Sequence, residues 1–203
     1  MNSVAVNGLT LTGETLDLAG NLKLGRDGRL REASFPIVRL DGDMEVTVDI
    51  RAADGGFAAS VSGRSFDARP LIDQLFSTVT RPPDADALTM RIDVDIDSMT
   101  AHRGEAITGL KGTMQLTGGV VDAADLRGSF LSGQPIALTV APAGSDMREL
   151  RLTGGDGGAV LRAADLYSKV IGGSVDFRAW LGPGRTGAVQ RGLLVIDRFE
   201  VEN

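Results

Sequence analysis

The sequence has no cysteine, and His102 is the single histidine among its 203 residues. The absence of cysteine excludes a disulfide framework and thiol chemistry, and it fits a cytosolic protein and a bacterial periplasmic domain equally well. Aromatic residues are also few, with one Trp, one Tyr and seven Phe. A core must therefore be built mainly from Leu, Val, Ile and Ala, in thin layers interrupted by 27 glycines.

Long apolar runs and blocks of like charge are absent as well. No stretch of about 18 apolar residues occurs, so the sequence predicts no transmembrane helix. The start, Met1 to Val6, lacks the charged flank and apolar segment of a signal peptide, and the chain stops in or just after a strand. We interpret it as a piece of a longer protein. The net charge of −6 is not gathered into a block, which argues against nucleic acid as a partner.

Alternation of apolar and polar residues dominates what is present, and it is typical of a sheet with one solvated face. It predicts three short strands within residues 4–24, a strand with an edge or a bend at Pro36, and a hairpin joining 44–52 to 57–65. Further strands are predicted at 87–99, 106–117, 119–129, 134–140, 148–153, 174–181 and 192–202. The predicted fold class is mainly β, a curled antiparallel sheet with two short helices.

Two stretches change from period two to helical spacing. The first predicted helix runs from Pro70 to Val79 and has a narrow apolar stripe, formed by Leu71, Ile72, Leu75, Phe76 and Val79. The second runs from Ala159 to Val170, with Asp156 as its N-cap and a glycine pair, Gly172-Gly173, as its end. The helices divide one unit, 1–203, into a weak repeat of two blocks, 1–80 and 85–203.

Three patterns that suggest chemistry fail on inspection. Asp93, Asp95 and Asp97 begin like a calcium loop, but Ser98 and Gly104 stand where that loop needs glycine and glutamate, so the solvated face of a strand explains them better. The glycines at 154–158 lack the lysine of a phosphate loop and fit a turn and helix cap. His102 has no ligand or nucleophile beside it in sequence. We therefore predict neither enzyme activity nor a cofactor or metal site.

The remaining candidate site is the apolar face of the sheet. Such a face can be hidden in a sandwich or barrel, or can line a trough covered by the two helices or by an apolar ligand such as an acyl chain. Periodicity leaves these alternatives open. The residues predicted to line a groove, which would serve equally as ordinary core, are Val94, Ile96, Met114, Leu116, Ile136, Leu138, Val175 and Phe177.

Four stretches resemble recurring signatures of the AsmA-like superfamily, with the YhdP-type proteins as the nearest branch. They are Ser65–Ile72, Asp156–Ala163, Ile171–Ser174 and Val195–Phe199, and the similarity runs from about Val46 to the end of the chain. These signatures are structural, and the resemblance supplies no catalytic residue.

The resemblance implies a periplasmic segment of a long, inner-membrane-anchored protein of the Gram-negative envelope. In such a protein a curled sheet with a hydrophobic groove carries phospholipid acyl chains between the inner and outer membranes. The implied partners are these acyl chains and the neighbouring segments of the full-length protein, and the membrane is reached only through parts outside this sequence. The alternative is a non-catalytic structural or partner-binding β-module of the same envelope.

Overall fold

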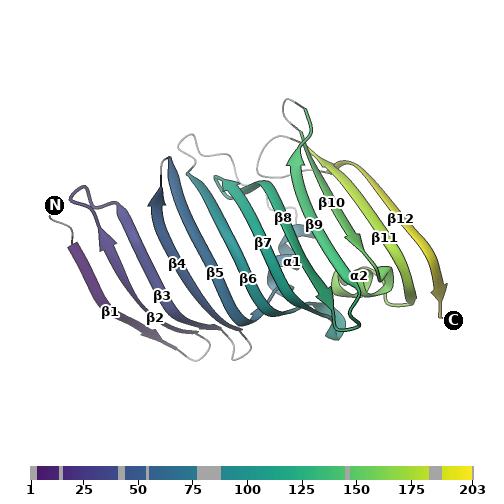
Figure 1. The fold of residues 1–203 in the computed structure, drawn as a ribbon, viewed down its shortest axis with the longest axis horizontal. Helices are drawn as coiled ribbons and strands as arrows, with labels where there is room; N and C mark the ends of the chain where they lie inside the picture. The colour runs from purple at the N-terminus through teal and green to yellow at the C-terminus, as the bar shows by residue number, and fades with distance from the viewer. Residues whose placement is uncertain are drawn as a thin grey trace.

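The structure is a computed structural model that describes residues 4–13, 16–40, 44–53, 55–76, 88–144, 147–182 and 189–202. Its twelve strands form one open sheet in which spatial order follows sequence order, so the two ends of the chain lie at opposite edges (Figure 1). The strands are β1 Val4–Thr12, β2 Leu16–Leu24, β3 Leu30–Leu40, β4 Met44–Ala53, β5 Gly56–Asp67, β6 Thr89–Thr100, β7 Ala106–Thr117, β8 Val120–Phe130, β9 Pro135–Pro142, β10 Arg148–Gly154, β11 Val170–Leu181 and β12 Val189–Val201.

Three helical segments accompany the sheet: α1 Arg69–Phe76, the 3-10 helix η1 His102–Gly104, and α2 Gly157–Ala163. In Figure 1, α1 lies behind the sheet, whereas η1 and α2 lie at the lower ends of the strands. The predicted class, mainly β with two short α-helices, is confirmed. No helix in the described ranges has the length and apolar character needed to cross a bilayer.

The antiparallel prediction is wrong for one pair of strands. β5 and β6 run parallel, whereas every other neighbouring pair is antiparallel. A hairpin turn can join only antiparallel strands, and parallel neighbours need a crossover long enough to return along the sheet. The α1 helix stands in that crossover, between the end of β5 at Asp67 and the start of β6 at Thr89.

Residues 16–24 form one strand, β2, and not the two that the glycines suggested. Gly20 lies inside the strand beneath the ring of Phe35, and a Cβ there would stand 2.4 Å from the Cδ1 atom of Phe35. The glycine is therefore needed for close approach of a neighbouring side chain and does not mark a turn. Pro36 falls at a register shift between Phe35 and Val38 in the interior strand β3, so of the two predicted roles it has that of a bend.

The second helix has the predicted N-cap, begins at Gly157, two residues before the predicted start, and ends earlier than predicted. The Asp156 side chain accepts a hydrogen bond from the Ala159 backbone N–H at 2.9 Å, which confirms the N-cap. The helix stops at Ala163, and the glycine pair predicted to end it lies inside β11, with φ of 63° at Gly172 and 79° at Gly173. Tyr167, which lies inside the predicted range of this helix, falls after its end and is exposed.

One connected cluster of buried apolar side chains lies at the lower end of the strands in Figure 1, where α1, η1 and α2 cover the sheet. A register shift between Thr108 and Lys111, with Gly109 at φ 60°, lies in β7 within this region and is of the kind that bends a strand. The buried cluster consists of Val46, Ile96, Ala101, Ile107, Leu110, Phe130, Ala159, Val160, Ala163 and Val175. We call these residues the capped core.

Phe130 is 1% exposed in the capped core, and the next residue, Leu131, is 72% exposed. We expect Phe130→Ala to lower the free energy of unfolding by about 3–5 kcal/mol, because it removes a buried ring and leaves a cavity. Leu131→Ala should change it by less than about 0.5 kcal/mol. Urea denaturation of both variants tests this expectation, and equal losses would show that Phe130 is not part of a packed core.

Candidate functional site

The backbone register lines up apolar residues into two adjacent rows on one face of the sheet. The first, the twelve-strand row, crosses every strand and consists of Val6, Leu22, Ala33, Ile50, Ala59, Ile92, Met114, Ala124, Val140, Leu150, Ala179 and Gly192. The second, the ten-strand row, crosses β3 to β12 and consists of Phe35, Val48, Val61, Val94, Gly112, Leu126, Leu138, Leu152, Phe177 and Leu194.

We call the face that carries both rows the apolar face. Directly paired residues of neighbouring strands point to the same side of a sheet, so each row is continuous in space. At a strand spacing of about 4.8 Å, the ten-strand row extends for roughly 40 Å. Neither row contains a polar or charged residue, so the apolar strip runs without interruption across most of the sheet.

Residue size makes the two rows unequal in exposure. The alanines of the twelve-strand row, such as Ala59, Ala124 and Ala179, are buried between their larger neighbours. The ten-strand row is half-buried from Phe35 to Phe177 and exposed at Leu194. The described strands all belong to one sheet, so none of them forms a second layer over these side chains. Large apolar groups therefore line an open surface above the capped core.

The structure places the eight predicted lining residues in two environments. Val94, Leu138 and Phe177 belong to the ten-strand row and Met114 to the twelve-strand row, and all four are half-buried. Leu116 and Ile136 are half-buried one step beyond the rows, where they pair with Val121 and Gly154. Ile96 and Val175 are only 2% and 4% exposed, so these two belong to the capped core and not to the open surface.

The predicted covering helix is described only in part. Ile72 is half-buried and contacts the capped core, which places α1 over the apolar face. The side chains of Leu71, Leu75 and Phe76, and all of Val79, lie outside the described part of the structure. Sequence reasoning missed Leu126, Leu152 and Leu194. Their alternation was visible, but their place in one row depends on register.

Arg148 brings a charge to the upper end of the apolar face. It lies two residues before Leu150 on β10, and its guanidinium donates to the carbonyl oxygens of Val121 at 2.7 Å and Gly182 at 3.1 Å. These carbonyls belong to β8 and to the residue that follows β11. Arg148 therefore ties three parts of the upper end together by charge-assisted hydrogen bonds.

Close contacts between ionisable side chains join the covering segments to each other. His102 Nε2 of η1 lies 3.0 Å from Asp73 Oδ1 of α1, and Arg103 Nε lies 2.6 Å from Asp165 Oδ1, just after α2. A third pair joins Arg162 Nε of α2 to Glu105 Oε1 at 2.6 Å. The Arg162 guanidinium also donates to the Val170 carbonyl oxygen at 3.0 Å. His102 Nε2 is buried without a hydrogen-bond partner in the described part of the chain, so the two arginine pairs provide the clearest links within the cover.

The Arg162–Glu105 pair is well shielded, with side-chain exposures of 26% and 19%, whereas the pair of Arg127 and Asp125 is exposed at 75% and 52%. Double-mutant cycles with Arg162→Met and Glu105→Gln should give a coupling energy above about 1 kcal/mol, because water screens a shielded pair less. The cycle with Arg127→Met and Asp125→Asn should give less than about 1 kcal/mol. Equal coupling energies would contradict a shielded link between η1 and α2.

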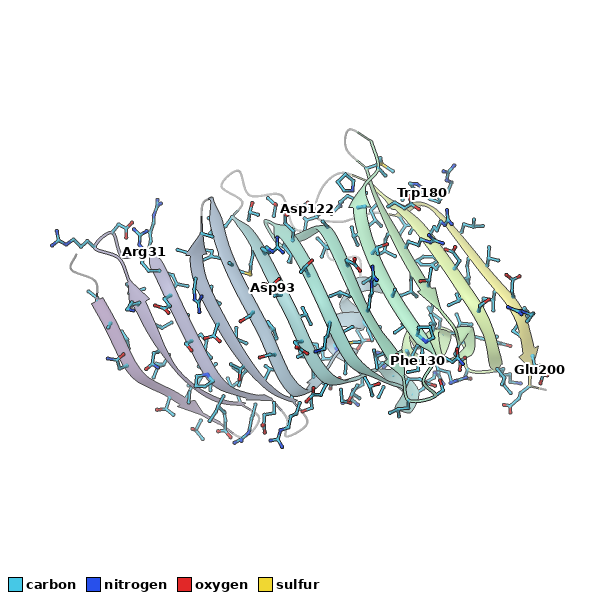
Figure 2. All side chains as sticks on the ribbon, in the orientation of Figure 1. Arg31, Asp93, Asp122, Phe130, Trp180 and Glu200 are labelled. Atoms are coloured by element: carbon cyan, nitrogen blue, oxygen red, sulfur yellow. The ribbon has the colours of Figure 1, made fainter. Side chains whose placement is uncertain are left out.

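The opposite face of the sheet is polar, and Figure 2 labels Asp93 among the side chains drawn on the sheet. Asp93, Asp95 and Asp97 are exposed, and Lys111 Nζ lies 3.0 Å from Asp95 Oδ2, so the strand-face interpretation of the aspartates is confirmed. A shallow depression at β6, β7 and β8 is lined by residues of both faces, Arg91, Thr113, Met114, Gln115, Ala123, Ala124 and Asp125. Within the described ranges, no three metal-ligating side chains gather in one place.

Asp176 carries the largest electrostatic perturbation on the polar face. Hydrogen bonds from Arg151, and next from Arg178, lower the pKa of its carboxyl to about 2. The Arg151 NH2 group lies 2.7 Å from Asp176 Oδ2. A pKa lowered in the folded state stabilises the fold above the pKa of the unfolded chain, and this contribution is lost as the pH falls toward the folded value.

We expect Asp176→Asn to lower the free energy of unfolding by a constant amount, less than about 1 kcal/mol for a partly exposed pair, at all pH values above about 5. The difference from the unchanged chain should shrink between about pH 4 and pH 2 as the native carboxyl takes up its proton. Urea titrations across this range test it. A difference that stays constant down to pH 2 would contradict the lowered pKa.

Comparison of the chain with models of protein families, with curated proteins and with solved structures found no match.

Proposed function

We propose that this chain is a segment of a periplasmic, bridge-like lipid-transfer protein, whose apolar face holds phospholipid acyl chains on their way between the inner and outer membranes. The observation that supports the proposal is the unbroken ten-strand row, which carries no polar group. Apart from Gly112 its members are large aliphatic or aromatic residues, half-buried from Phe35 to Phe177 and exposed at Leu194. Contiguous apolar surface of this extent is rare on soluble proteins unless it binds something. The periplasmic location and the anchoring through other parts of the protein follow from the resemblance to the AsmA-like superfamily.

The dimensions of the surface suit an acyl chain. Half of a bilayer's hydrocarbon core is about 15 Å thick, so a chain of that length laid along the ten-strand row covers roughly three strand spacings. A row without polar interruptions offers equivalent positions along its length, which permits sliding and sets no preferred stopping point. This role requires no catalytic group, and we propose none.

A second candidate, a structural or partner-binding β-module, is favoured by the two edge strands. Val4 and Leu11 of β1, and Val189 and Val201 of β12, are each more than half exposed. Exposed apolar edges are sites where another strand can add to a sheet. In this candidate, neighbouring segments of the full-length protein occupy the edges and the apolar face binds protein instead of lipid.

A matched pair of lysine substitutions tests the lipid proposal. Leu116 is half-buried at the apolar face, and its neighbour Gln115 is exposed. Leu116→Lys should lower binding of a fluorescent fatty acid by about tenfold or more, because hydrocarbon would have to approach a charged group. Gln115→Lys should leave binding unchanged. Native mass spectrometry should likewise show co-purifying phospholipid with the unchanged chain and the Gln115 variant only.

The Leu116 variant should remain folded, since a lysine at an open surface can extend its charged end to water. Loss of its cooperative unfolding transition would place Leu116 in closed core and contradict an open face. Leu138→Lys and its neighbour Thr139→Lys repeat the comparison in the ten-strand row itself. Equal binding by all four variants, or a chain that never binds lipid, would refute the lipid proposal and leave the partner-binding module.

A further inference from the structure

The outer edge of β12 is a regular, unpaired strand edge to which the proposed function gives no role. β12 is the last strand of the sheet, so no described strand pairs with that edge. Its regular portion runs from Arg191 to Asp197, where each residue pairs in step with β11 from Trp180 back to Ser174. A register shift lies beside Trp180, and Arg198 has a left-handed φ of 57°. A seven-residue ladder bounded by irregular backbone is therefore available for pairing.

The middle of this portion is apolar on both sides of the sheet. Leu194 and Ile196 lie on the apolar face, while Leu193 and Val195 lie on the polar face and are 53% and 42% exposed. Continuous apolar runs are typical of strands enclosed within a structure. Natural edge strands are usually protected by charges, prolines or bulges, and residues 192–196 contain none of these.

The charges that flank this run are arranged symmetrically about Leu194. Arg191 lies three residues before it and Asp197 three residues after it, both on the polar face and both exposed. In an antiparallel pair related by a two-fold axis through Leu194, each Arg191 faces Asp197 of the other strand. Leu193 then faces Val195, and the two copies of Leu194 face each other. The segment is therefore complementary to itself in charge and in apolar content.

We propose that β12 pairs antiparallel with β12 of a second copy of this chain, in the register centred on Leu194. Such an interface is isologous, because the same edge is used by both copies. Shifting the register by two residues in either direction would place Arg191 opposite Val195 or Phe199 and leave the charges unmatched. Pairing with β1 of another copy offers no match either, since residues 4–12 carry no charge.

The proposed arrangement has a defined consequence for the assembly. A two-fold axis perpendicular to the sheet keeps both apolar faces on the same side, so the apolar strip continues from one copy into the other. The capped end of each copy then lies beside the open end of its partner. This interface depends on the β12 edge alone and does not require that the apolar face binds lipid.

Charge reversal with rescue tests the register. The dimer population of the unchanged chain should rise with concentration in sedimentation equilibrium. Arg191→Asp and Asp197→Arg, made singly, each oppose like charges twice and should raise the dimer Kd by about tenfold or more. The double variant restores opposite charges and should return the Kd to within about threefold of the original. Arg127→Asp, on the polar face of β8, should have no effect.

Arg191 also stacks over the Trp180 ring, with its guanidinium carbon 4.3 Å from the ring centroid. Thermal unfolding of each variant therefore serves as a folding control, and only variants that unfold cooperatively enter the comparison. A chain that stays monomeric at every concentration would overturn the proposal. Single reversals without effect on the Kd, or a double variant as weak as either single one, would overturn it as well.

Cysteine cross-linking tests the axis directly, because the chain contains no cysteine of its own. Facing residues in antiparallel strands have Cα atoms about 4.5–5.5 Å apart, within the range that a disulfide spans. Leu194→Cys should give a covalent dimer under mild oxidation. The yield of covalent dimer should be at least about tenfold lower for Leu193→Cys, because its two copies are offset along the strands, and for Thr10→Cys on β1. Equal yields from the three variants would refute the register.

Discussion

Pairing of each strand with its neighbour in sequence is the constraint on which the rest of this structure depends. Directly paired residues of neighbouring strands point to the same face of the sheet. The period-two alternation of each strand therefore lines up into continuous rows from β1 to β12. Where the chain gains a residue, as at Gly109 in β7, the register shift restores the alternation on the following strand. The result is a sheet with one apolar face and a length set by strand number. No described strand returns to cover that face.

The short helical segments cover only the lower end of the face. α1 stands in the connection to the single parallel strand, η1 joins β6 to β7, and α2 joins β10 to β11. The Glu105–Arg162 ion pair and the contact of His102 with Asp73 link these segments although they come from distant parts of the chain. Packing is therefore concentrated around Phe130 and Ile96, and the remainder of the apolar face depends on neighbours within the sheet.

Because the described strands form a single layer, two surfaces remain uncovered, the apolar face and the β12 edge. These surfaces require different partners. The apolar face offers aliphatic side chains without hydrogen-bonding groups, which suits a hydrocarbon chain. The β12 edge offers unpaired backbone groups with Arg191 and Asp197 placed about Leu194, which suits another strand. The side chains of the apolar face project from the sheet, whereas the backbone groups of the β12 edge point outward in the plane of the sheet. A partner bound at one surface therefore leaves the other accessible. An assembly of two copies would lengthen the apolar strip, and each proposal can fail without the other.

The sequence by itself determined the elements that depend on local chemistry: the alternating strands, the hairpin of β4 and β5, the Asp156 cap and the apolar face as the candidate site. It misled at two glycines, since Gly20 lies beneath Phe35 and Gly172 lies within β11 with a positive φ, and neither one ends an element. Only the tertiary structure decided that Val94 and Leu138 line an open row while Ile96 and Val175 are buried beneath the helices. All four residues alternate in the same way along their strands. Their difference arises from which part of the face the helices cover, and that depends on contacts between residues far apart in the chain.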